Sequence, residues 1–308
     1  MKKFIKRFNN KLIIGVLVAA CTLGVAGVVN AATATVDLGT ASSFAVLAGS
    51  AVTNVPTSVI KGNVGLSPAA GGNYAGLTQL EVTGTIYAVD GFGPGGSVNN
   101  PGLLTTAKND LTAAYTDASG RTPATVLSGG DNQLGGQTLV PGVYSFSHAT
   151  TANLTAASPL TLNGDGIYIF QASSDLVTAP GSSVVLTGGA QACNVFWTVP
   201  SSGSSFGTNS SFVGTIMAYS SLNLKTGASL QGRVLAETAA VTLDHNTITV
   251  PTTCTAPTGG NGATAPKFPN TGYISEQNNS ILWAAGITAG VIGTALVSIL
   301  IVRKKRAL

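Results

Sequence analysis

The sequence predicts a mainly β protein in which short strands stack as a β-solenoid and one long α-helix packs alongside. The main observation lies between about Val195 and Val250, where apolar and polar residues alternate and Phe212, Leu230 and Ile248 recur at a constant interval. Alternation is typical of strands, and a fixed period of this length indicates three short strands per turn of a stacked coil. Each turn would have an apolar inner face that only its neighbours can bury.

The other elements follow from shorter patterns. Residues 36 to 98 are rich in Val, Thr and Gly and are expected to form further strands. One helix is expected at about 101–119, because Asn100 can cap it and Pro101 suits its first turn. Its apolar face would comprise Leu104, Ala107, Leu111, Ala114, Tyr115 and Ala118, and Gly120 and Pro123 would end it.

Residues 1–31 are predicted to be a secretory signal peptide. Five cations in the first 11 residues precede an apolar run over residues 12–29, and small residues lead up to Ala31. We expect cleavage after Ala31, with Ala34 as the second choice. A competing interpretation stays open, in which residues 18–21 form a bacterial lipobox and Cys21 is lipidated.

The C-terminal end is predicted to direct the protein to the cell wall. Residues 281–302 carry no charge and are long enough to cross a membrane, and the basic tail 303–308 would stay cytoplasmic. Just upstream, Phe268-Pro269-Asn270-Thr271-Gly272 resembles the LPxTG sorting signal of Gram-positive surface proteins, with Phe in place of Leu. The resemblance implies a sortase that cuts after Thr271 and joins it to peptidoglycan. A plain single-pass membrane anchor is the alternative, and residues 255–267 would be a flexible linker in either case.

The charge distribution excludes nucleic acid as a partner. The chain of 308 residues has a formal net charge of +4, but nine of its 15 cations lie in the two ends. Between Ala32 and Gly272 there are 6 Lys and Arg against 10 Asp and Glu, which gives 6 − 10 = −4. A phosphate-binding surface needs clustered cations, and this body is mildly acidic and sparsely charged.

Catalysis and metal binding require converging groups, which the sequence does not offer. His148, His245 and ten carboxylates are scattered along the body, and no serine lies in a nucleophile elbow. We therefore expect no enzyme activity, no cofactor and no metal. Once the signal peptide is removed, Cys193 and Cys254 remain, and an exported protein with an even pair of cysteines is expected to join them as a disulfide.

Short Thr- and Ser-bearing steps recur at the coil spacing. They predict two parallel columns on one flat, uncharged face, formed by Thr155, Ser158, Thr178, Thr208, Ser211, Thr226, Ser229 and Thr247. One interpretation is simply that Thr suits strands and Ser suits turns. The other is binding to ice, because an ice lattice offers a plane of ordered water, and a rigid Thr presents a methyl and a hydroxyl group with little entropy to lose.

Several motifs, in order, resemble the ice-binding protein family of bacteria, fungi and diatoms. They are Leu38 to Ser50, Gly62 to Pro68, Gly120 to Pro123, Pro141 to Tyr144, Gly189 to Trp197 and Gly232 to Ala236. The resemblance implies a right-handed β-solenoid of triangular section over residues 32–254, with discontinuous coil order because N-terminal strands insert beside later ones. Part of the family carries a T-A/G-x-T/N step on its ice-binding face, which the steps here match imperfectly.

Together these observations predict a monomeric ice-binding protein that is secreted and anchored to the cell wall or cell surface. Its expected partners are ice, a sortase, peptidoglycan and, before sorting, the membrane. The alternative hypothesis is a surface adhesin or structural solenoid that binds a glycan or a protein. Aromatic platforms would favour a glycan, and the only Trp in the body, Trp197, lies in an expected core strand.

Overall fold

A computed structural model describes residues 33–122, 125–127, 133–146, 151–156, 158–201 and 203–255. All of them belong to one compact unit of the chain, which ends at Asn261. The predicted signal peptide, the sorting signal, the membrane segment and all but the first residue of the linker lie outside the described residues. Within the described ranges, no helix is long and apolar enough to cross a membrane.

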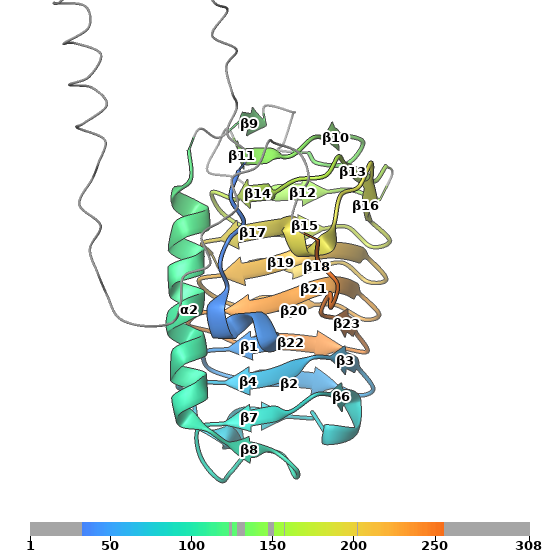
Figure 1. Cartoon of the computed structure of the whole chain (residues 1–308). Coiled ribbons are helices and arrows are strands. Elements are labelled where there is room, and N and C mark those ends of the chain that lie inside the picture. Colours follow the sequence, from blue (N-terminus) through green and yellow to red (C-terminus); the bar gives the residue numbers. More distant parts are fainter. Residues whose placement is uncertain are drawn as a thin grey trace, which may run out of the picture. The chain divides into compact units, whose positions relative to one another are not determined.

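The strands stack in parallel as a β-solenoid, which confirms the predicted fold class (Figure 1). Each turn of the chain, here called a coil, contributes strands to up to three faces. Face A consists of β9 (Thr125–Leu127), β11 (Gly142–Phe146), β14 (Tyr168–Gln171), β17 (Val195–Val199), the second halves of β19 (Ser211–Ala218) and β21 (Ser229–Ala236), β1 (Phe44–Ala48), β4 (Asn63–Leu66), β7 (Ile86–Ala88) and β8 (Val98–Asn99).

Two further faces complete the solenoid. Face B consists of β12 (Ala152–Leu154), β15 (Leu176–Thr178), β18 (Ser205–Phe206), β20 (Leu222–Leu224), β22 (Val241–Asp244), β2 (Val52–Val55) and β5 (Tyr74–Ala75). Face C consists of β10 (Thr138–Leu139), β13 (Leu160–Asn163), β16 (Val184–Thr187), the first halves of β19 and β21, β23 (Thr247–Thr249), β3 (Val59–Lys61) and β6 (Val82–Thr83). Short 3-10 helices lie between strands: η2 (Gly39–Ser43), η3 (Gly71–Asn73), η4 (Gln79–Glu81) and η6 (Ala192–Asn194).

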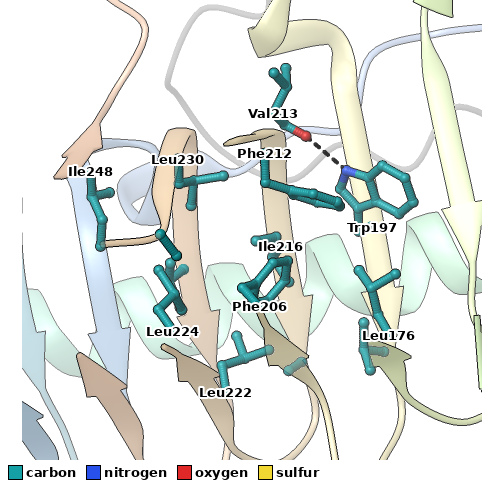
Figure 2. Packing of buried hydrophobic residues seen from close by; sticks show 14 of the residues in the cluster. Leu176, Trp197, Phe206, Phe212, Val213, Ile216, Leu222, Leu224, Leu230 and Ile248 are labelled. Atoms are coloured by element: carbon teal, nitrogen blue, oxygen red, sulfur yellow. Dashed lines mark hydrogen bonds between the residues drawn. The ribbon is translucent and has the colours of Figure 1, made fainter. Parts of the chain in front are cut away.

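The constant interval in the sequence is the register between neighbouring coils. Phe212 lies beside Leu230, and Leu230 beside Ile248, and all three side chains are buried. Figure 2 shows them in one row of the core that continues to Trp197. Because identical positions of successive coils stack, each apolar residue covers the next, and the core runs along the whole stack.

The coil order is discontinuous, as the family resemblance implied. The last strands of the described chain do not end the stack, because β21 pairs with β1, β22 with β2 and β23 with β3. The N-terminal coils therefore continue the solenoid beyond the C-terminal coil. In Figure 1 the blue N-terminal strands lie next to the orange C-terminal ones.

The helix α2 (Pro101–Gly120) confirms the one predicted helix and packs along face A (Figure 1). Asn100 is its N-cap, and the side-chain oxygen accepts a hydrogen bond from the Leu103 backbone at 3.0 Å. The buried residues of the helix are Leu104, Ala107, Leu111, Ala114 and Ala118, while the predicted Tyr115 is half-buried. They form a second apolar cluster with outward side chains of face A, so this face is covered.

Two glycines let β19 and β21 pass from face C to face A. Gly214 has a φ of +109°, and Gly232 lies beside it in the next coil. A Cβ on Gly232 would lie 1.9 Å from the Gly214 backbone oxygen. Neither position has room for a side chain, which explains why glycine recurs here from one coil to the next.

Candidate functional site

In four coils the corner between faces B and C contains one left-handed residue. Gly181, Asn209, Gly227 and His245 have φ values of 68°, 55°, 71° and 52°. The last three recur at the coil period and occupy the same place in successive coils. This repeated turn keeps the residues on either side of the corner aligned from coil to coil.

Thr208 and Thr226 are neighbours immediately before this corner, as the spacing predicted. The Asn209 backbone N–H donates to the Thr226 carbonyl oxygen at 3.0 Å, which places the two threonines side by side. Thr208 is half-buried and Thr226 exposed. The Thr226 hydroxyl donates to the Asp244 carboxylate, and hydrogen bonds from Thr226 and His245 lower the pKa of Asp244.

The predicted position of Thr178 in this column is wrong. Thr178 lies beside Leu154 in the register and points into the core, with 3% of its surface exposed. Its Oγ1 accepts a hydrogen bond from the Gly207 backbone at 2.8 Å. The coils upstream of Val195 are longer than the last ones, so the spacing of the last coils does not carry over to them. Thr155 is half-buried and Ser158 exposed at the same corner.

The second predicted column forms for Ser211, Ser229 and Thr247, but it lies around the corner on face C, and the predicted place of Ser158 in it is wrong. Ser211 bridges to Ser183, and Leu160 pairs with Val184, so Ser158 lies one position off this column. Ser211 pairs with Ser229, and Ser229 with Thr247. These residues line a groove of about 560 Å³ on face C, together with Val185, Gln231 and Thr249 among others. The Thr column and the Ser column are thus separated by the left-handed turn and do not share one plane.

The open outward row of face B was not identified from the sequence. It consists of Asn153, Val177, Ser205, Asn223, Thr242, Thr53 and Ala75, which follow one another in the strand register. Each is half-buried or exposed, and none is charged. The alternation in residues 222–224 and 241–243, where an outward polar residue separates two buried apolar ones, is the signal that could have revealed this row.

The three faces differ in what covers them. Helix α2 lies on face A. On face C the segment around η6 packs against β19, and Val213 is only 6% exposed although it alternates with the inward Phe212. On face B the outward row stays accessible in all seven strands. Face B is therefore the face best suited to contact an extended flat partner.

Comparison with known proteins identifies the fold family. The family model described as ice-binding-like matches residues 46–249. The chain belongs to the ice-binding-like family. An ice-binding protein of a Colwellia species is 42% identical over 220 residues, covering 70% of this chain and 84% of the relative. One of Flavobacterium frigoris strain PS1 is 39% identical over 218 residues, covering 70% and 76%.

Solved structures of ice-binding proteins share the fold. One from an Arctic yeast matches with a TM-score of 0.63 and 35% identity, covering 72% of this chain and 96% of that one. A domain of Shewanella frigidimarina ice-binding protein 1 matches with a TM-score of 0.62 and 33% identity, covering 71% and 98%. The likeness extends over nearly the whole solenoid of this ice-binding-like chain.

The described residues of this family member include most of its candidate metal ligands and both cysteines of the predicted disulfide. No group of three or more His, Cys, Asp or Glu side chains that could hold a metal is found among them, and His148 lies outside them. The disulfide predicted between Cys193 and Cys254 is present, with 6.1 Å between the Cα atoms. It joins the segment after β23 to η6 at the edge of face C.

Proposed function

We propose that this protein binds ice through face B, using the outward row together with Thr208 and Thr226 at its edge. The observation that carries the proposal is the open, uncharged row of seven side chains on a rigid parallel sheet. Membership of the ice-binding-like family and relatives named as ice-binding proteins support it. It is a binding function and requires no enzymatic chemistry.

The physical basis is the regular geometry of the row. Neighbouring parallel strands lie about 4.8 Å apart, so the outward side chains repeat at that interval along the stack. Asn223, Thr242 and Thr53 sit on three successive strands, and their positions are fixed by backbone ladders on both sides. Each contact with water in a lattice is weak, but rigidly linked contacts must break together, which makes release slow.

The outward row of face B contains no charged side chain, unlike the neighbouring surface. A charged head group is strongly hydrated and keeps its own mobile water, which opposes contact with an ordered lattice. Among the described residues of face B and its corner with face C, the charged side chains near the row are Lys225, Asp244 and Glu81. Glu81 is buried, and Lys225 and Asp244 lie toward the corner. Face C instead carries Lys61 beside Thr249 and is hollowed by the groove.

We further propose that the ice-binding body is displayed on the cell surface. A signal peptide over residues 1–31 would export it, and the sequence from Phe268 to Gly272 would be cut by a sortase and joined to peptidoglycan through Thr271. If it is not cut, residues 281–302 would hold the body at the membrane. Detection of Thr271 linked to a wall peptide, by mass spectrometry of digested cell walls, tests the sorting step.

The ice proposal is tested with two matched substitutions. Thr242→Lys places a mobile cation in the middle of face B, and Thr249→Lys places the same group on face C, at a residue of similar exposure in the next strand of the chain. In the unit of residues 33–261 we expect Thr242→Lys to reduce ice shaping and inhibition of recrystallisation strongly, and Thr249→Lys to leave both close to the parent values.

Results that would contradict face B as the contact surface differ from results that would contradict ice binding itself. Equal loss in both variants, or loss in Thr249→Lys alone, would show that face B is not the contact surface. If the parent unit neither shapes ice nor slows recrystallisation, ice binding itself is excluded and the surface-adhesin hypothesis takes its place. Circular dichroism and a urea transition for each variant establish that the fold is retained.

A further inference from the structure

β23, the last strand of the described chain, lies inside the stack and not at its end. β23 lies between β21 and β3, and the buried Ile248 is packed between Leu230 and Ile60. Removal of this strand would therefore open the middle of the stack and not its end. β23 is only three residues long, so few backbone hydrogen bonds hold it.

The chain then leaves β23 along the stack and not along the strand direction. Val250 still donates a backbone hydrogen bond to Lys61 at 3.0 Å. From there the chain turns toward η6, and residues 249–253 line a second hollow with Gln231 and Leu186, which belong to other coils. In Figure 1 the red end of the described chain rises from β23 past β21. A pull in this direction loads the hydrogen bonds of β23 one after another, which is the weak geometry for a strand.

Two connections fasten this segment to η6. The disulfide joins Cys254 to Cys193 across a sequence separation of 61 residues. Beside it, the Gln191 side-chain oxygen accepts hydrogen bonds from the Thr255 backbone and hydroxyl, each at 3.0 Å. The covalent link thus lies at the last residues before the chain leaves the described body.

We propose that the Cys193–Cys254 disulfide is a mechanical clamp, which carries force from the C-terminal attachment directly into the coil of η6 and β17. Residues 194–253 lie within the covalent loop and cannot be drawn out by a pull at Thr255. Force instead reaches β17, whose Trp197 is packed between Phe170 and Phe212 in the core. The role in a cell rests on the proposed wall attachment and ice contact, whereas the clamp itself is a property of the body.

Single-molecule pulling of the unit of residues 33–261 tests the clamp. One handle is fixed at position 112 on the exposed side of α2, through a bioorthogonal side chain, and the other at the C-terminus. In the Cys193→Ser/Cys254→Ser variant we expect an early extension at lower force, up to about 200 Å for a loop of this length. The disulfide-bonded protein should lack this step.

A second pulling geometry distinguishes a clamp from a general stabiliser. With handles at position 112 and the N-terminus, the disulfide is outside the force path, and the first unfolding event should occur at the same force in both proteins. An equal fall in both geometries, or the absence of the early extension in the first, would overturn the proposal. If the double variant does not fold, reduction of the folded, tethered parent protein makes the same comparison.

Two controls complete the experiment. Gln191→Ala removes the neighbouring hydrogen bonds but keeps the covalent link, and we expect it to retain the unfolding force of the parent. Ice shaping without load is measured on the same samples. If the double variant still shapes ice and its first unfolding event in the C-terminal geometry occurs at the force of the parent, the clamp is refuted and the proposed function is not. If the parent itself does not shape ice, only the proposed function is refuted.

Discussion

The indole Nε1 of Trp197 donates a hydrogen bond of 2.9 Å to the backbone oxygen of Val213, which ties the largest core side chain of one coil to the backbone of the next (Figure 2). The ring of Trp197 also stacks on Phe170, with 3.9 Å between centroids. Trp197 is 1% exposed. One buried side chain therefore links three successive coils. The middle coil, which contains β17, also contains Cys193 of the disulfide.

Truncation of Trp197 is expected to be strongly destabilising. Trp197→Ala leaves a large cavity between two aromatic rings and should lower the free energy of unfolding by about 3–5 kcal/mol. Trp197→Phe keeps much of the stacking but leaves the Val213 oxygen without this donor, and a loss of about 1–3 kcal/mol is expected. Urea unfolding measures both. Tyr219→Ala, at a side chain 52% exposed, is the control and should stay within about 0.5 kcal/mol of the parent; equal losses in all three would contradict this account.

The corner between faces B and C allows a matched pair of glycine substitutions. Gly181 and Gly227 both have positive φ, so alanine is strained at either. A Cβ on Gly181 meets nothing within 4 Å, whereas one on Gly227 would lie 2.3 Å from the Asn209 side-chain oxygen. Gly181→Ala should therefore cost about 1–2 kcal/mol of unfolding free energy, and Gly227→Ala more.

A double substitution isolates the contact between these coils. Asn209→Gly is compatible with the left-handed backbone and removes the atom that a Cβ on residue 227 would meet. When Asn209→Gly is combined with Gly227→Ala, the clash is absent. The loss of unfolding free energy caused by Gly227→Ala should then fall to about that caused by Gly181→Ala. A double-mutant cycle on urea-unfolding free energies checks this, and strict additivity would show that the clash is relieved in another way.

The last coils were predicted well because their length is constant. Phe212, Leu230 and Ile248 stack as the sequence period indicated, and Asn100 caps the one helix. Thr178 was misplaced because the coils before Val195 have different lengths, so that sequence spacing does not give the register there. Register between coils of unequal length depends on which apolar residues fill the core, and this is a tertiary property.

The site was harder to predict than the fold. Hydroxyl residues at coil spacing were found, but the left-handed turn at Asn209 and His245 divides them between two faces. Left-handed non-glycine residues leave little trace in a single sequence, so two columns that lie close in sequence were predicted to be coplanar. The row through Asn223 and Thr242 was missed because its members are of mixed type and share only their place in the alternation.

Lys108 of helix α2 contacts the end of β21, and its titration is expected to make the stability of the protein depend on pH. Its Nζ donates to the backbone oxygens of Ala236 at 2.7 Å and Glu237 at 2.5 Å. Burial lowers the pKa of Lys108 to about 8, and the nearby Glu237 carboxylate partly opposes that shift. Burial also raises the pKa of Glu237, the titratable group that interacts with Lys108.

The sign of the effect follows from the proton balance. Between about pH 8 and pH 10, Lys108 is protonated in the unfolded chain and increasingly neutral in the folded one, so unfolding takes up a proton and this group's contribution to stability rises with pH. Lys108→Met removes the titrating group. As the pH rises from about 8 to about 10, the unfolding free energy of the parent should therefore increase relative to that of this variant. Urea transitions at a series of pH values measure it; a difference that stays constant, or changes in favour of the variant, would contradict the burial of Lys108.

Lys225 offers a test in which ice activity is expected to increase. It is exposed directly after β20, next to Thr226 and close to the outward row that contains Asn223. Its head group keeps mobile water beside a surface that we propose to order water, so Lys225→Thr should strengthen ice shaping and recrystallisation inhibition, with little change in stability because the site is exposed. Lys61→Thr, which removes an exposed cation from face C, is the matched control and should have no effect. If both variants gain equally, net charge and not the composition of face B governs the activity, and if Lys225→Thr loses activity, the ammonium group itself contributes to the contact.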